Sequence, residues 1–146
     1  MQLGSITQKN TVEYYNNNNH SLTRLLLHKQ PIKTYHQNIR SLRYKMNELQ
    51  CYLSHDPHIL CITEHRLHHE ELASFHTENY VLGSCYCRKP KHKGGVCIFI
   101  HNSIKFTSLD IDNSCLDQDS EACAIHLNSK HDKLCILATL GILTLF

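Results

Sequence analysis

The segment IKTYHQNIRSLRYKMNELQCYLSHDPHILCITE, residues 32–64, decides the fold of this chain. Its first eight residues are compatible with a β-strand. Apolar residues then recur from Leu42 to Leu53 at spacings of four, three and four positions. This spacing predicts an amphipathic helix with Ser41 as its N-cap. Asp56-Pro57 ends the predicted helix, because the residue before a proline avoids the helical conformation.

A continuous apolar run, residues 58–63, follows the helix and predicts a strand that is covered on both faces. Strand, helix and strand in this order form a crossover unit, so both strands are parallel and finish at the same edge. Asn38 ends the first strand and Glu64 follows the second. In open α/β sheets ligands bind at this edge. We therefore predict an amide and a carboxylate side by side, although taken singly each is typical of a turn, a cap or a solvated surface.

The rest of the domain predicts short elements of both kinds. Residues 69–75 favour a short helix, and residues 80–88 favour an extended stretch. The pair Gly94-Gly95 precedes the apolar run of residues 96–100, which indicates a β-hairpin. Further strands are predicted at residues 104–109, 121–127 and 134–140.

The chain of 146 residues, of which 41% are hydrophobic, is long enough for one domain. Residues 1–30 are polar and rich in asparagine, and they predict a disordered or loosely helical leader with a helical stretch around residues 21–28. The domain is expected at residues 31–140, followed by an apolar tail at residues 141–146. The apolar C-terminal segment is shorter than the ~20 residues that cross a bilayer, so no membrane partner is expected.

The eight cysteines match neither a disulfide framework nor a zinc motif. Five of them stand singly in apolar runs and are expected to behave as small hydrophobic residues: Cys51, Cys61, Cys97, Cys123 and Cys135. The pair Cys85 and Cys87 has one intervening residue, which suits a strand better than a zinc knuckle. His65, His68 and His69 lack the order of a zinc-binding helix and are expected on a polar, solvated helix face.

The formal net charge of +2 neither requires nor excludes a polyanionic partner. The one dense basic stretch is the loop at residues 88–93, with Arg88, Lys89, Lys91 and Lys93. These residues, together with Arg40, are candidate nucleic-acid contacts, and a solvated turn is the alternative.

Three segments, taken together, resemble a known family. HQNIRSL at residues 36–42, PHILCITEH at residues 57–65 and KGGVCIFI at residues 93–100 follow one another in the order and at the spacings of three signatures of the endonuclease/exonuclease/phosphatase superfamily. The form of the first two is most similar to the apurinic-type endonuclease domain of non-LTR, LINE-like retrotransposons. The resemblance covers roughly residues 32–138.

The resemblance implies a DNase I-like four-layer α/β sandwich that hydrolyses phosphodiester bonds of DNA with Mg²⁺, acting in the nucleus. By this resemblance Glu64 is a metal ligand, and Asn38 lies beside it and helps to hold the catalytic site. Oxygen ligands of this kind suit Mg²⁺, which keeps waters and a substrate phosphate in its shell. Glu121, at a position where relatives often carry a glutamate within a strand, is a much weaker candidate, and the alternative is that it only supports the sheet.

The chain departs from the family pattern after residue 138. The family's Tyr-Arg-x-Pro, Gly-Asp-x-Asn and Ser-Asp-His segments do not occur in these 146 residues. We therefore expect a partial sandwich without its C-terminal half, a truncated relic of the endonuclease that is inactive by itself. Two alternatives stay open: a fragment that binds nucleic acid or protein without cleavage, and an incomplete gene model of a full-length endonuclease and reverse transcriptase polyprotein.

Overall fold

The computed structural model describes residues 11–16, 20–27, 30–89, 93–116, 119–128 and 133–141. Mixed α/β content is confirmed, and the described residues form many strands and few helices. The helices are α1 (Met46–Leu53) and α2 (His69–Ala73), with 3-10 turns η1 (Leu42–Tyr44) and η2 (Asp112–Ser114). The strands are β1 (Thr11–Asn16), β2 (His20–Leu27), β3 (Gln30–Asn38), β4 (Ile59–Thr63), β5 (Tyr80–Tyr86), β6 (Val96–His101), β7 (Phe106–Leu109), β8 (Ser120–Asn128) and β9 (Lys133–Gly141).

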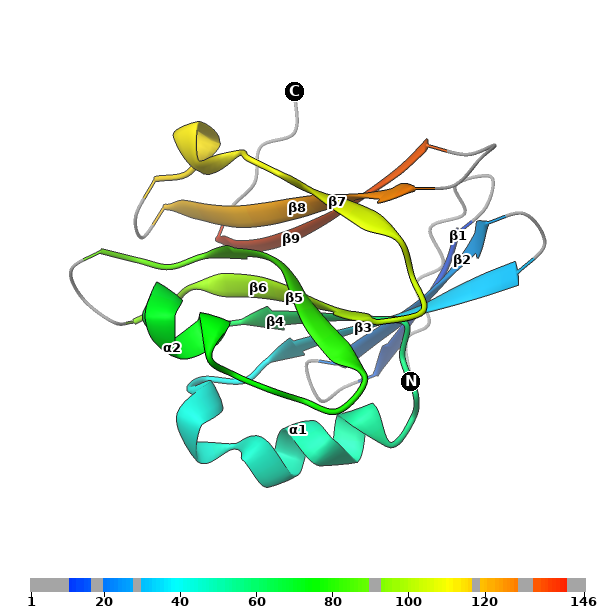
Figure 1. The fold of residues 1–146 in the computed structure, drawn as a ribbon, viewed down its shortest axis with the longest axis horizontal. Helices are drawn as coiled ribbons and strands as arrows, with labels where there is room; N and C mark the ends of the chain where they lie inside the picture. The colour runs from blue at the N-terminus through cyan, green and yellow to red at the C-terminus, as the bar shows by residue number, and fades with distance from the viewer. Residues whose placement is uncertain are drawn as a thin grey trace.

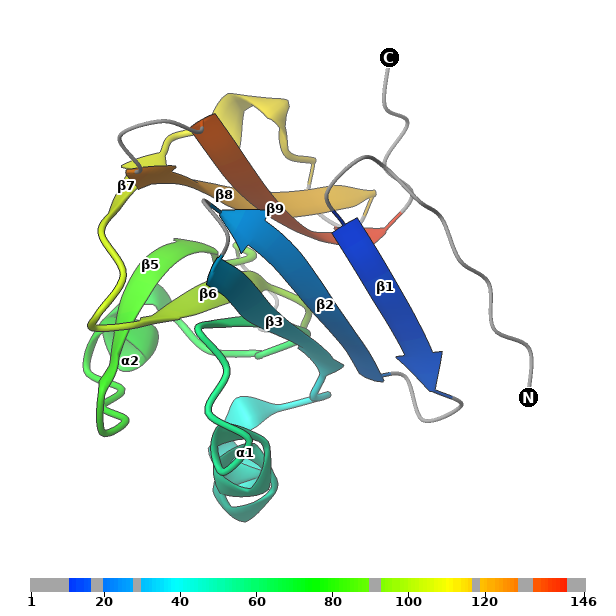
Figure 2. The ribbon, with the colours of Figure 1, turned by 90° about the vertical axis from the view of Figure 1, so that its right-hand side faces the viewer.

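The strands form two sheets that pack face to face (Figure 1). One sheet has six strands in the order β1-β2-β3-β4-β6-β5, and the other has three in the order β7-β8-β9. Figure 2 shows α1 on the face of the six-stranded sheet that points away from the three-stranded sheet. The described residues thus form three layers: helices, a large sheet and a small sheet.

The predicted crossover unit is confirmed in its central feature, the parallel pairing of β3 with β4. Every residue of β4 is buried, as its continuous apolar run predicted. The helix between the two strands begins later than expected, because a 3-10 turn precedes α1. Ser41 as N-cap is wrong: its side chain makes no capping hydrogen bond, and its backbone N–H donates to the Glu64 carbonyl instead, at 2.8 Å.

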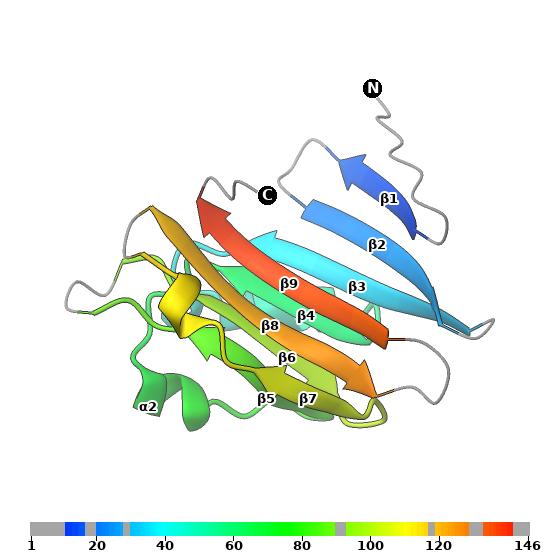
Figure 3. The ribbon, with the colours of Figure 1, turned by 90° about the horizontal axis from the view of Figure 1, so that it is seen from above.

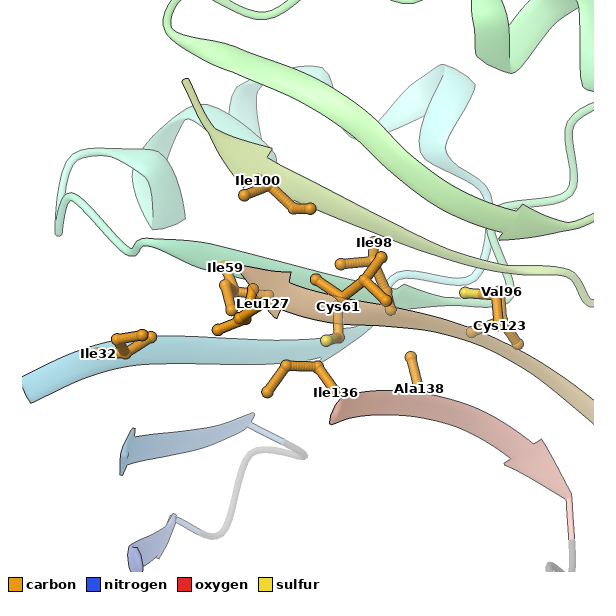
Figure 4. Packing of buried hydrophobic residues seen from close by; sticks show 11 residues of the cluster. Ile32, Ile59, Cys61, Val96, Ile98, Ile100, Cys123, Leu127, Ile136 and Ala138 are labelled. Atoms are coloured by element: carbon orange, nitrogen blue, oxygen red, sulfur yellow. The ribbon is translucent and has the colours of Figure 1, made fainter. Parts of the chain in front are cut away.

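Two apolar clusters fix the layers. The cluster between the sheets joins isoleucines of the large sheet, such as Ile59, Ile98 and Ile100, to Ile136 and Leu127 of the small sheet (Figure 4). The second cluster lies under the helices. Its members include Leu49 of α1 and Leu72 of α2, both fully buried. Each such side chain contributes about 1.5–3 kcal/mol on burial, so these contacts hold the crossover unit in place.

The helical or disordered leader is wrong where the structure describes it. The residues around 21–28, expected to be helical, form strand β2 up to Leu27, which pairs antiparallel with β3, and β1 pairs with β2. Figure 3 shows β1 and β2 to one side of the three-stranded sheet. The parts of the leader at residues 1–10, 17–19 and 28–29, and the apolar tail at residues 142–146, lie outside the described residues.

The remaining predicted elements agree with the structure to within a few residues. The predicted hairpin is the antiparallel pair β5 and β6, and the last three predicted strands are β7, β8 and β9. Among the ranges that the structure describes, no helix is both long and apolar enough to span a bilayer.

Candidate functional site

The edge at the ends of β3 and β4 brings Asn38 and Glu64 together. Asn38 is the register partner of Thr63, the last residue of β4, and Glu64 follows directly. The pairing continues past both strands, because the Ile39 N–H donates to the Thr63 carbonyl at 3.0 Å. The Asn38 amide Nδ2 donates to Glu64 Oε1 at 3.0 Å. The predicted placement of the two side chains is therefore correct.

The second oxygen of Glu64 contacts a residue that the sequence did not single out. The Arg66 guanidinium lies 3.2 Å from Glu64 Oε2, and the two side chains are 38% and 25% exposed. At this exposure the pair is partly screened by water, so it contributes little to stability. Its importance is local, since it places a positive charge beside the carboxylate.

The backbone at this edge is strained on both sides. Glu64 and Arg66 have φ values of 56° and 57°, and Arg40 and Ser41 have 49° and 104°. For a residue with a Cβ the left-handed region costs about 1–2 kcal/mol. Such residues persist only where surrounding contacts impose the conformation, and they cluster at functional sites. We therefore regard these two loops as one candidate site, called the Glu64 rim below and comprising residues 38–41 and 64–66.

The Glu64 rim contains a carboxylate and an amide oxygen, the types of oxygen atom that a hard cation such as Mg²⁺ prefers. Since the Asn38 amide nitrogen faces Glu64, its oxygen Oδ1 points elsewhere, and it is buried without a hydrogen-bond partner. A buried acceptor left unpaired costs free energy, so this oxygen is suited to bind a ligand. Among the described residues no cluster of three or more His, Cys, Asp or Glu side chains could enclose a metal ion. A cation here would therefore keep water or substrate oxygens in most of its shell.

His65 is a buried residue that sequence analysis placed wrongly. It was expected on a solvated helix face, yet it precedes α2 and its exposed fraction is 0%. The Leu67 N–H donates to Nδ1 at 3.0 Å, so Nε2 carries the proton and donates to the Tyr86 carbonyl at 3.1 Å. Burial lowers the pKa of His65, which keeps the ring neutral. Both ring nitrogens of His65 therefore form hydrogen bonds with backbone groups. His68 and His69 are exposed.

Glu121, the weak candidate, lies in β8 with an exposed fraction of 1%. Its Oε2 accepts from the Gly95 N–H at 2.6 Å, and its Oε1 accepts from Arg88 Nε at 2.5 Å. This carboxylate joins the small sheet to the start of β6 and to the end of β5. The structure thus agrees with the alternative of a supporting role.

The candidate nucleic-acid contacts differ in exposure and in ion pairing. Arg40, Lys89 and Lys93 are exposed, whereas Arg88 forms an ion pair with buried Glu121. Lys91 lies outside the described residues. The guanidinium of Arg88 is thus already engaged, while Arg40 comes two residues after Asn38 on the Glu64 rim.

The cysteines divide by burial. Cys61, Cys97 and Cys123 are buried as small hydrophobic residues, but Cys51 and Cys135 are exposed, so the expectation is wrong for these two. Burial raises the pKa of Cys61 to about 12, and it behaves as an inert core thiol. The pair Cys85 and Cys87 lines a hollow of about 630 Å³ beside β5, together with His69, Asp112 and Cys115. A hydrogen bond from Cys87 lowers the pKa of Cys85.

No family model matches the chain, and no match was found among curated proteins.

Proposed function

We propose that this chain carries the glutamate and asparagine of a Mg²⁺-dependent phosphodiesterase site of the endonuclease/exonuclease/phosphatase type, with DNA as the ancestral substrate. The observation that carries the proposal is the 3.0 Å hydrogen bond between Asn38 Nδ2 and Glu64 Oε1 at the shared edge of β3 and β4. The three sequence segments that resemble the family surround this edge. The proposal rests on these segments and on the geometry of the Glu64 rim.

Each residue has a definable role. Glu64 supplies an anionic oxygen ligand, and Asn38 orients that carboxylate while presenting its unpaired Oδ1. Arg66 balances part of the negative charge of Glu64. When bound, Mg²⁺ would stabilise charge that develops on a phosphate and on its leaving oxygen.

We expect no turnover from these residues alone. The 146 residues contain no Gly-Asp-x-Asn and no Ser-Asp-His segment, which in the family supply the base and the phosphate-binding histidine. A positioned base or acid typically contributes about 10²- to 10⁴-fold in rate. One carboxylate and one amide bind a cation, but they do not activate water.

The test is a titration with Mn²⁺, used as a paramagnetic probe for the magnesium site, followed by NMR of the backbone amides. We expect Mn²⁺ to broaden the signals of residues around Asn38 and Glu64. Glu64→Gln should abolish the broadening, and Glu70→Gln on the exposed surface of α2 should leave it unchanged. If the signals at the Glu64 rim do not broaden first, the metal site is wrong.

A cleavage assay tests the second part of the proposal. We expect no nicking of plasmid DNA that contains abasic sites, with or without Mg²⁺. Mg²⁺-dependent nicking that Glu64→Ala abolishes would overturn the expected inactivity and would assign the missing catalytic groups to other residues of this chain.

Binding without cleavage is the second candidate, favoured by the exposed Arg40 on the Glu64 rim. Removing one cation that binds a phosphate reduces the slope of log affinity against log salt by about 0.7–0.9. A salt-dependent mobility shift with DNA that Arg40→Gln weakens would support this candidate, whereas a shift insensitive to salt would exclude it.

A further inference from the structure

Among the described residues, Glu121 at the start of β8 is a charged side chain buried beside the apolar cluster between the two sheets. There, buried Glu121 meets Arg88, whose side chain is 16% exposed, and the backbone of Gly95. Desolvating a carboxylate costs several kcal/mol, and apolar side chains of similar size often serve stability as well or better. The contacts of Glu121 therefore suggest a role other than stability alone.

A chain of hydrogen bonds leads from the Glu121 carboxylate to both neighbours of Glu64. The Gly95 N–H donates to Glu121 Oε2 at 2.6 Å. The Gly95 carbonyl accepts from the His65 N–H at 3.4 Å, and the Gly94 carbonyl accepts from the Arg66 N–H at 2.9 Å. The residues on both sides of Glu64 are thus tied to a turn that Glu121 holds.

The space around this turn admits only glycine. Both Gly94 and Gly95 have a φ of 85°, where a Cβ is strained. A Cβ on Gly95 would overlap the His65 imidazole, and one on Gly94 would lie 2.7 Å from Glu121 Oε2 and 2.6 Å from the Arg88 guanidinium. The imidazole and the ion pair therefore enclose the two glycines from two sides.

His65 extends the same network to β5. Its Nε2 donates to the Tyr86 carbonyl at 3.1 Å, and Arg88 comes two residues after Tyr86. The turn, the end of β5 and the loop of Glu64 are thus held against one another by the side chains of His65, Arg88 and Glu121.

We propose that Glu121, Arg88 and His65 are positioning residues, which act through the Gly94-Gly95 turn to hold Glu64 in its left-handed conformation for cation binding. The inference rests on the proposed function for its cation. Its structural part, the dependence of the Glu64 loop on the ion pair between Arg88 and Glu121, does not depend on that function. Substituting residues that position a metal ligand typically lowers metal affinity by about 10- to 100-fold.

The test uses two variants of the network and one control. Glu121→Gln keeps the size of the side chain but has only one acceptor for two donors. Arg88→Lys keeps the charge and removes the Nε donor; it is the milder change, which keeps the test open if Glu121→Gln does not fold. Ile125→Val, in the same strand, removes one methylene from the core without touching the network, so it measures the effect of general destabilisation.

Two readouts are recorded for the folded state of each variant: Mn²⁺ affinity, from the broadening of rim amides, and hydrogen exchange of the Arg66 and Ser41 amides. We expect both network variants to lower the Mn²⁺ affinity and the amide protection at least about tenfold relative to Ile125→Val. Equal values for the network variants and the control would overturn the positioning role. If the wild-type rim does not bind Mn²⁺, the proposed function fails, and the exchange data still decide whether the network holds Glu64.

Discussion

Glu64 and Glu121 are two carboxylates with similar partners and different surroundings. Each is paired with an arginine, Arg66 or Arg88. In both carboxylates each oxygen accepts a hydrogen bond, but Glu121 is 1% exposed, whereas the side chain of Glu64 is 25% exposed. Beside Glu64, the Asn38 Oδ1 and Arg66 Nε atoms are buried without partners. Buried polar groups are normally satisfied, so the unpaired atoms beside the partly exposed Glu64 are suited to a ligand, whereas the buried Glu121 is suited to a supporting role.

The largest effect expected from this comparison is on stability. Glu121→Ala should lower the free energy of unfolding by about 3–5 kcal/mol, because it leaves the Arg88 charge and the Gly95 N–H without their acceptor. Glu64→Ala should cost at most about 1 kcal/mol, since its ion pair is partly exposed. Urea unfolding measures both free energies. Similar losses for the two variants would show that Glu64 and Glu121 do not differ in their contribution to stability.

A second variant probes the turn that joins the two carboxylates. Gly95→Ala should cost about 2–4 kcal/mol, from left-handed strain and from overlap with the His65 ring. The overlap part should disappear when the ring is removed. In a double-mutant cycle, Gly95→Ala combined with His65→Ala should therefore cost less than the sum of the single variants, and strict additivity would show that the ring does not confine the turn.

The sequence predicted the surroundings of Glu64 better than those of Glu121. Asn38 and Glu64 meet because two parallel strands end at one edge, and the apolar run of β4 and the helical spacing before it are local patterns. The burial of His65 and Glu121 depends on partners far along the chain, Tyr86 and Arg88, which no local pattern reveals. Their only local signal was the glycine pair, which indicated a hairpin but not what encloses it.

The errors elsewhere have a similar cause. The asparagine-rich start of the chain has the composition of a loose segment, yet β2 gains backbone hydrogen bonds from β3, and composition does not encode that pairing. Ser41 has the side chain of a helix cap, but its N–H donates to the Glu64 carbonyl and its φ is 104°. Tertiary hydrogen bonds at the Glu64 rim thus override a local preference.

A third prediction separates function from stability at the rim. Glu64→Asn should leave the free energy of unfolding unchanged or raise it by up to about 1 kcal/mol, because asparagine tolerates the left-handed conformation that Glu64 adopts at a cost. The same variant should lose Mn²⁺ binding, since the anionic ligand is gone. Thermal unfolding and the Mn²⁺ titration give the two values, and a marked loss of stability would mean that Glu64 is itself a structural residue.

The smallest effect concerns pH and compares the two ends of β4. His58, just before the strand, accepts the Lys33 N–H at Nδ1 over 3.0 Å, and desolvation lowers its pKa, as burial does for His65 at the other end. A histidine with a lowered folded pKa is protonated first in the unfolded state, so its contribution is intact above the unfolded pKa of about 6.5. Acidification through that value should therefore lower the free energy of unfolding, until the folded pKa is passed. Urea unfolding between pH 7.5 and pH 5.5 measures this loss of stability, and the loss should be smaller in His58→Gln. An unchanged loss would assign the effect to the other buried histidines. Stability that rises on acidification would contradict the neutral state of both rings.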